Sequence, residues 1–149
     1  MPRQAGFTLV ELMVVILILG ILGASAMPVY NTWRQRSFGS EAYVTMKNLL
    51  EGEILYYLEH DAFFPDEGND IRIPREGPFT TETTQDVTRI ADALKIEVQV
   101  GRNLEYYIRN YGDELYVIIS AGFPLFKHGH RALHGRLTHT GRMDIFPAG

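Results

Sequence analysis

Near the N-terminus, a single acidic residue directly precedes a long uncharged stretch of the sequence. Glu11 is followed by residues 12–33, which include no charged side chain and are largely aliphatic. An ionised carboxylate at the margin of an apolar helix is costly unless it finds a cation or reaches water. Glu11 is therefore predicted either to pair with a positive group or to extend to the membrane surface.

The uncharged stretch has the length of a membrane span. As a helix it would extend roughly 33 Å, close to the hydrocarbon core of a bilayer at about 30 Å. A secretory signal is cleaved after its apolar region, whereas here the short leader, residues 1–6 with one positive charge at Arg3, comes first. This order predicts a processing signal before the apolar region rather than after it.

The six residues Gly6-Phe7-Thr8-Leu9-Val10-Glu11, followed by the apolar stretch, carry a family resemblance. They resemble the N-terminal motif of the type IV pilin family, which includes the pseudopilins of type II secretion systems. The resemblance implies cleavage after Gly6 by the prepilin peptidase and N-methylation of Phe7, so that the apolar helix stays in the mature protein. It also implies that Glu11 neutralises the amine of a neighbouring subunit during assembly, with Thr8 and Pro28 as further assembly residues.

Three helix-weakening residues interrupt the aliphatic run: Gly20, Gly23 and Pro28. A glycine weakens a helix by about 1 kcal/mol, and an interior proline removes a hydrogen bond and clashes with the preceding turn. The resemblance implies that the helix becomes locally extended here in an assembled pilus. Close packing of helices through small residues is the alternative interpretation.

After Pro28 the pattern becomes amphipathic, with apolar residues every three or four positions, as at Ala42, Met46 and Leu50. This predicts that the helix continues over residues 30–60. Residues 61–86 are rich in proline, glycine and acidic residues, which is typical of a loop. A short helix is predicted to start at Thr84-Gln85-Asp86 and to run through Leu94.

Period-two alternation then predicts strands at 95–100, 104–109 and 114–120, with a fourth segment, 136–146, folding back around Thr140-Gly141. A turn at Gly112-Asp113 should join the second and third strands as a hairpin. The predicted fold class is α+β, with one long N-terminal helix on a three- to four-stranded antiparallel sheet, which is also the pilin fold. The predicted domains are the leader 1–6, a transmembrane and filament-core helix 7–33, and a soluble pilin-like domain 34–149.

The C-terminal region is basic in a chain whose net charge is −4. Four alternatives are open for this region: a solvated surface, a contact with another subunit, nucleic-acid binding and metal binding. Nucleic-acid binding is not favoured because the negative net charge of the chain repels polyanions. Metal binding is not favoured because the spacing of the histidines matches no recognised set of metal ligands. The candidate basic contact surface consists of Lys127, Arg131, Arg136 and Arg142, interleaved with His128, His130, His134 and His139.

Catalysis and cofactors are not expected. The chain has no cysteine, and it contains no nucleophile motif, phosphate-binding glycine loop or zinc-protease motif. The acidic residues of the 61–86 loop do not match the spacing of an EF-hand calcium loop. The sequence therefore indicates neither a metal site nor an enzyme.

The leading hypothesis is a structural subunit of a type IV pilus, minor or divergent, that self-associates into a helical filament. It would span the bacterial inner membrane once, among lipid, before assembly by an inner-membrane platform, and would then lie in an extracellular pilus. A pseudopilin of a type II secretion system, forming a periplasmic pseudopilus, is the first alternative. The second is a monomeric membrane-anchored module that binds DNA or an anionic glycan through residues 127–142.

Overall fold

A computed structural model describes residues 6–149, so most of the predicted leader, including Arg3, lies outside the described residues. The chain divides into two compact units, one that ends at Arg34 and one that spans Gln35–Gly149. Helix α1, Leu9–His60, contributes residues to both units. It begins two residues later than the predicted start at Phe7, because Thr8 caps it.

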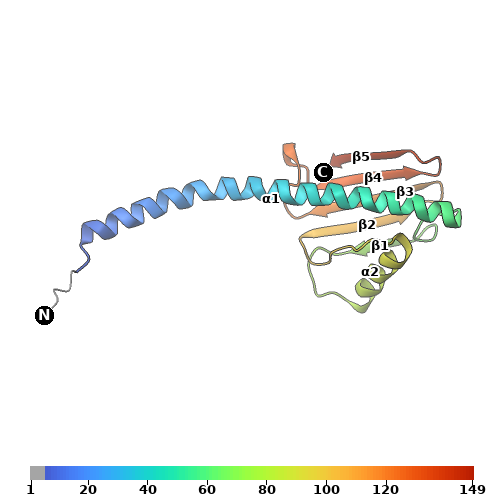
Figure 1. The fold of residues 1–149 in the computed structure, drawn as a ribbon, viewed down its shortest axis with the longest axis horizontal. Helices are drawn as coiled ribbons and strands as arrows, with labels where there is room; N and C mark the ends of the chain where they lie inside the picture. The colour runs from blue at the N-terminus through green and yellow to red at the C-terminus, as the bar shows by residue number, and fades with distance from the viewer. Residues whose placement is uncertain (1–5) are drawn as a thin grey trace. The chain divides into compact units, whose positions relative to one another are not determined.

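The Gln35–Gly149 unit contains a five-stranded antiparallel sheet (Figure 1). The strand order β1-β2-β3-β4-β5 follows the sequence, so every strand pairs with its neighbours along the chain. The prediction of a long helix on an antiparallel sheet is confirmed, but the sheet has one strand more than the three to four expected. The strands are β1 (Asp70–Ile73), β2 (Leu104–Asn110), β3 (Glu114–Ala121), β4 (Ala132–Thr138) and β5 (Met143–Ala148).

Two strand predictions are wrong for related reasons. Strand β1 lies inside the predicted loop 61–86, where Ile71 and Ile73 alternate into the core and pair with β2. The predicted strand 95–100 forms no strand, although Val98 is buried. Strand β1, and not residues 95–100, pairs with the edge of β2 that β3 leaves free, and residues 95–100 remain in the connection between α2 and β2.

The second helix, α2 (Thr81–Leu94), begins three residues earlier than predicted. Thr80 is its N-cap, and the Thr80 hydroxyl accepts a hydrogen bond from the Thr83 amide at 3.2 Å. A threonine at this position satisfies one of the free amides of the first turn. Helix α2 packs beside β1 and covers that edge of the sheet (Figure 1).

The core lies between the inner face of the sheet and one face of α1. The predicted helix face is confirmed, since Ala42, Met46 and Leu50 are fully buried. The predicted strand faces are also confirmed, with Tyr106 and Leu115 among their buried residues. Burying each large aliphatic side chain stabilises the fold by about 1.5–3 kcal/mol.

A glycine in α1 marks a close approach between the helix and the β3–β4 connection. A Cβ atom on Gly39 would lie 2.5 Å from the backbone carbonyl oxygen of Leu125. Gly39→Ala is therefore expected to reduce the free energy of unfolding by about 1–3 kcal/mol, because a backbone atom cannot move aside cheaply. Urea unfolding of the full chain in detergent, followed by tyrosine near-ultraviolet circular dichroism, measures the loss, and an unchanged midpoint would contradict the close approach. Ser40→Ala, at an exposed neighbouring position, is the control.

Candidate functional site

The predicted cleavage site lies in an extended, exposed segment ahead of α1. Gly6 and Phe7 are not helical, and the Phe7 side chain is 72% exposed. Thr8 directly precedes the first helical residue, Leu9. The Gly6–Phe7 bond is thus free of secondary structure, as a bond that enters a peptidase site must be.

Glu11 and Thr8 form a reciprocal cap at the start of α1. The Glu11 carboxylate accepts hydrogen bonds from the Thr8 amide at 3.2 Å and from the Thr8 hydroxyl at 3.1 Å. The Thr8 hydroxyl in turn accepts from the Glu11 amide at 3.2 Å. This is the capping-box arrangement, and it places the carboxylate at the positive end of the helix dipole. Glu11 therefore has a polar partner within its own chain.

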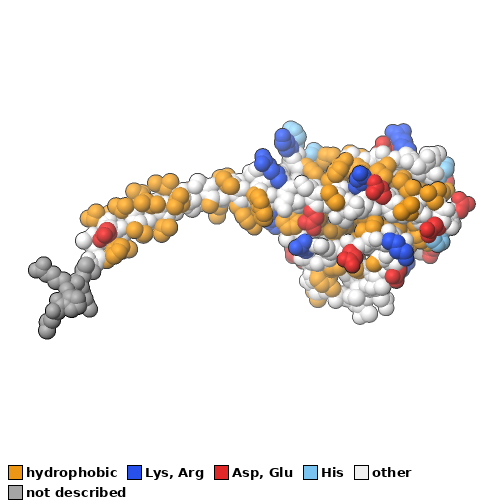
Figure 2. Space-filling view, viewed as in Figure 1, with side chains coloured by type: hydrophobic (Ala, Val, Ile, Leu, Met, Phe, Trp, Pro, Cys, Tyr) orange, Lys and Arg blue, Asp and Glu red, His pale blue; other side chains and the backbone are white. Residues whose placement is uncertain are grey.

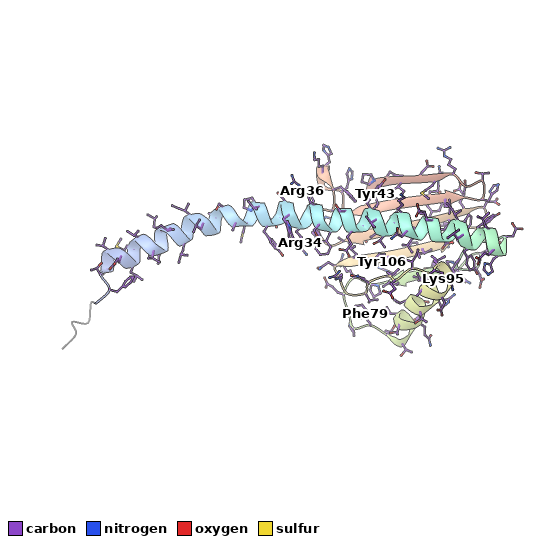
Figure 3. All side chains as sticks on the ribbon, in the orientation of Figure 1. Arg34, Arg36, Tyr43, Phe79, Lys95 and Tyr106 are labelled. Atoms are coloured by element: carbon purple, nitrogen blue, oxygen red, sulfur yellow. The ribbon has the colours of Figure 1, made fainter. Side chains whose placement is uncertain are left out.

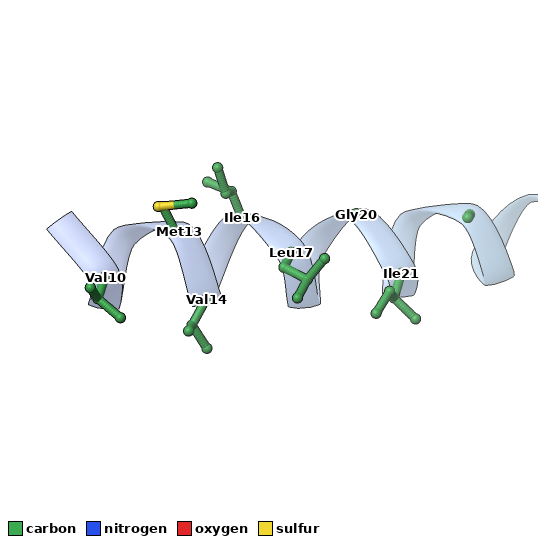
Figure 4. Close-up of a pocket in the computed structure, with 8 residues that line it drawn as sticks. Val10, Met13, Val14, Ile16, Leu17, Gly20 and Ile21 are labelled. Atoms are coloured by element: carbon green, nitrogen blue, oxygen red, sulfur yellow. The ribbon is translucent and has the colours of Figure 1, made fainter.

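The helix that follows presents apolar side chains on all sides. Among the described residues, α1 is the one helix long and apolar enough to cross a bilayer, and none of its most apolar window is buried. So large an exposed apolar surface marks a membrane or protein interface. Figure 4 shows one strip of it, lined by Val10, Met13, Val14, Ile16, Leu17, Gly20, Ile21 and Ala24.

The helix-weakening residues lie within continuous helix. Gly20 and Gly23 have open space where a Cβ would be, and Pro28 lies inside α1. The Thr32 hydroxyl donates to the Pro28 carbonyl at 2.9 Å. Because Pro28 has no amide hydrogen, the helix lacks one backbone hydrogen bond in the turn before it.

The four candidate basic residues separate into two groups. Lys127 and Arg131 are exposed in the β3–β4 connection. Arg136 donates to the Asp144 carboxylate at 2.9 Å, and Arg142 lies 3.2 Å from the same carboxylate. The hydrogen bond from Arg136 holds the pKa of Asp144 below its usual value. Arg136 and Arg142 are therefore ion-paired within the domain, whereas Lys127 and Arg131 are not part of this cluster.

The histidines are spread over the domain. His128 and His130 lie in the β3–β4 connection, His134 lies against Phe146, and His139 lies 4.0 Å from Asp113. Residues 6–149 contain no group of three or more His, Cys, Asp or Glu side chains placed to hold a metal ion.

Sequence reasoning missed a buried carboxyl group, Glu53, on the inner face of α1. Its side chain is fully buried, and one carboxylate oxygen accepts a hydrogen bond from the Phe64 amide at 3.0 Å, while the other has no hydrogen-bond partner among residues 6–149. Burial raises the pKa of Glu53 to about 8, against a smaller lowering by the Phe64 amide. The sequence pattern could have shown this, because Glu53 follows Met46 and Leu50 at helical spacing and so lies on the same face of the helix.

Asn110, at the end of β2, is the second residue that sequence reasoning missed. Its Nδ2 donates to the carbonyls of Phe63 at 2.9 Å and Pro65 at 2.7 Å, and its Oδ1 accepts from the Gly112 amide at 2.7 Å. Asn110 thereby joins the β2–β3 turn to the α1–β1 connection. Its place on the buried side of β2, after Tyr106 and Ile108, was the available signal.

Comparisons with known proteins agree with the N-terminal motif. The family described as "Prokaryotic N-terminal methylation motif" matches residues 1–27. The type IV major pilin protein PilA of Myxococcus xanthus is 39% identical over 77 residues, covering 46% of this chain and 35% of that protein. The type IV major pilin protein PilE1 of Neisseria gonorrhoeae is 46% identical over 57 residues, covering 38% of this chain and 34% of the relative.

The fimbrial protein EcpC of Eikenella corrodens is 58% identical over 50 residues, which cover 34% of this chain and 30% of that protein. The chain thus spans about a third of the length of the curated relatives it matches. No solved structure matches it significantly. The chain thus has a methylation motif at its start, is similar to type IV major pilins over up to 46% of its length, and has a long helix on an antiparallel sheet, and these findings support the type IV pilin family.

Proposed function

We propose that this chain is a structural subunit of a type IV pilus. It is inserted in the bacterial inner membrane by the apolar part of α1, cleaved after Gly6, methylated at Phe7 and polymerised through the same helix. The observation that carries the proposal is the uncovered apolar surface of α1 directly after the Thr8–Glu11 cap. Lipid covers this surface before assembly, and the helices of other subunits cover it afterwards.

The role of Glu11 follows from the cost of moving a carboxylate out of water. Cleavage after Gly6 creates a positive amine on Phe7, so each subunit carries one anion and one cation at the start of its helix. In a filament core, Glu11 is stabilised if it binds the amine of a neighbour, because an unpaired buried charge is strongly unfavourable. The prepilin peptidase and an inner-membrane assembly platform are the partners that this route requires.

Replacement of Glu11 separates its charge from its capping role. Glu11→Ala and Glu11→Gln are both expected to lower the yield of sheared filaments about tenfold or more, since each removes the anion. Glu11→Gln removes the charge but retains the capping box. Thr8→Ala removes the cap but keeps the Glu11 charge, so it is expected to lower the filament yield much less. Immunoblots of filament and membrane fractions measure the distribution. Normal yield from Glu11→Gln would refute pairing as the driving interaction.

The proposed function is tested by mass spectrometry of the N-terminal peptide in sheared filaments and in inner membranes of the native host. A methylated peptide that starts at Phe7 in the filaments supports a pilus subunit. The same peptide confined to membranes would instead indicate a pseudopilin of a type II secretion system. An intact leader in both fractions would leave a membrane-anchored module and would overturn the proposal.

A further inference from the structure

The two ends of the Gln35–Gly149 domain carry opposite charge. One end is formed by the first turns of its part of α1 and by the β3–β4 connection, which includes the short helix η1 (Lys127–Gly129). The Gln35 side chain donates to the Phe126 carbonyl, which joins these two segments. Figure 2 shows Lys, Arg and His side chains at this end.

Three exposed cations define this basic end: Arg36, Lys127 and Arg131. Arg36 is labelled in Figure 3, at the start of the domain's part of α1. Within residues 6–149, none of the three lies within 4.0 Å of a carboxylate. The three cations are therefore available to an outside partner.

The opposite end lies where α1 finishes at His60. The α1–β1 connection and the β2–β3 turn meet there through Asn110, and the His139 amide donates to the Asp113 carbonyl at 3.0 Å. The acidic end consists of the exposed residues Glu59, Asp61, Asp66, Glu67 and Asp113. Of these, only Asp113 has an ion-pair neighbour among the described residues, His139 at 4.0 Å. The cation of the β4–β5 turn, Arg142, pairs with Asp144.

We propose that the basic end of one copy contacts the acidic end of the next copy along the filament. The inference rests on the proposed function, which does not specify how the soluble domains of neighbouring subunits contact each other. Two different patches on identical subunits form a heterologous contact, which repeats without closing and so builds a filament. Opposite charges at the two patches fix which end meets which.

The net charge of the chain favours a second copy over a polyanion as the partner. At −4 overall, the protein repels nucleic acid and acidic glycans, and also its own copies, unless the unpaired cations meet acidic side chains. Contacts between exposed charges act over about 8 Å at physiological salt. They therefore set the register and orientation of the domains, whereas the apolar helix supplies most of the stabilisation.

The test reverses one end, the other end, or both, in the full chain in its native host. The basic-end variant is Arg36→Glu/Lys127→Glu/Arg131→Glu, and the acidic-end variant is Glu59→Lys/Asp66→Lys/Asp113→Lys. Each alone places like charges at every junction and is expected to lower sheared-filament yield about tenfold. The sixfold variant, which combines both sets, restores complementarity with inverted polarity and the native net charge, so its yield is expected to return to within about twofold of wild type.

Controls separate this contact from folding and processing. Lys47→Glu/Glu51→Lys inverts an exposed pair on α1 away from both ends and is expected to leave the yield unchanged. Membrane level and the Phe7 peptide are measured for every variant, so that a loss of folding or cleavage is seen directly.

The inference would be overturned by a sixfold variant as poor as either parent, or by normal yield from both single-end variants. Normal filaments that lose salt-sensitive heparin binding in the basic-end variant would also overturn it, in favour of a polyanion. If wild-type filaments lack the Phe7 peptide, the proposed function itself fails.

Discussion

Raising the pH from 5 to 9 is expected to destabilise the full chain through Glu53 by about 3–5 kcal/mol. The unfolded carboxyl ionises near its model value of 4.5, whereas burial keeps it protonated in the fold until a pKa of about 8. Between these values the folded state holds one more proton than the unfolded state. Stability is therefore complete below about pH 4.5, falls as the pH rises through 8, and then levels off.

Glu53→Gln is expected to remove most of this pH dependence, because the amide is neutral and its oxygen still accepts from the Phe64 amide. The variant should be more stable than wild type at pH 9 and similar to it at pH 5. Urea unfolding in detergent at both pH values measures the difference between the two proteins, which cancels the other titrating groups.

Glu51→Gln serves as the matched control for Glu53→Gln, since Glu51 is exposed and faces Lys47 at 3.6 Å. Its pH profile should run parallel to that of wild type. A Glu53→Gln profile parallel to wild type would mean that Glu53 is hydrated and ionised in the fold.

Asn110→Ala is expected to reduce the free energy of unfolding by about 3–5 kcal/mol, because three hydrogen bonds at a buried junction are lost together. Asn110→Asp should be worse. Its carboxylate keeps the Gly112 contact but faces the Phe63 and Pro65 carbonyls, to which the native side chain donates. Asn48→Ala, at an exposed position of α1, is the control.

Hydrogen exchange adds a local measurement for Asn110. The Gly68 amide donates to the Asn110 carbonyl at 3.0 Å and the Asn69 amide to the Asp66 carbonyl at 3.0 Å. Both amides should lose protection in Asn110→Ala before the central strands do. Uniform loss across the sheet, or none, would show that Asn110 does not hold this junction.

The elements that the sequence predicts correctly are those with several turns or repeats of one period. Helix α1 shows the 3.6-residue spacing from Ala42 to Ile54, and β2 and β3 alternate strictly on either side of Gly112. The β4–β5 hairpin likewise folds back where Thr140-Gly141 predicts it. Long periodic segments bury one continuous face, so their pattern is fixed by packing.

The errors arise where a short segment depends on its neighbours. Strand β1 has only four residues, and its two isoleucines are surrounded by loop residues. Ile96 and Val98 alternate like a strand because both pack on the core, but alternation does not report which segment pairs with β2, and β1 takes that place.

The residues of the candidate site likewise include some that the sequence could locate and some that it could not. The GFTLVE motif locates the N-terminal residues from sequence alone, and the Thr-x-x-Glu spacing within it already has the form of a capping box. The placement of the basic residues could not be predicted, because it depends on which strand end each occupies. Arg136 reaches Asp144 across β4 and β5, while Lys127 projects from a connection.

The strand order of the sheet has a kinetic consequence. Because each strand pairs with the one before it along the chain, no pairing waits for a distant segment. Pairing between strands that follow one another in the sequence closes shorter loops than pairing between distant strands, which favours rapid formation of the sheet. If the domain crosses a bilayer from its N-terminus onward, as the proposed function requires, it can add strands in the order in which they emerge, without a late strand inserting between two earlier ones.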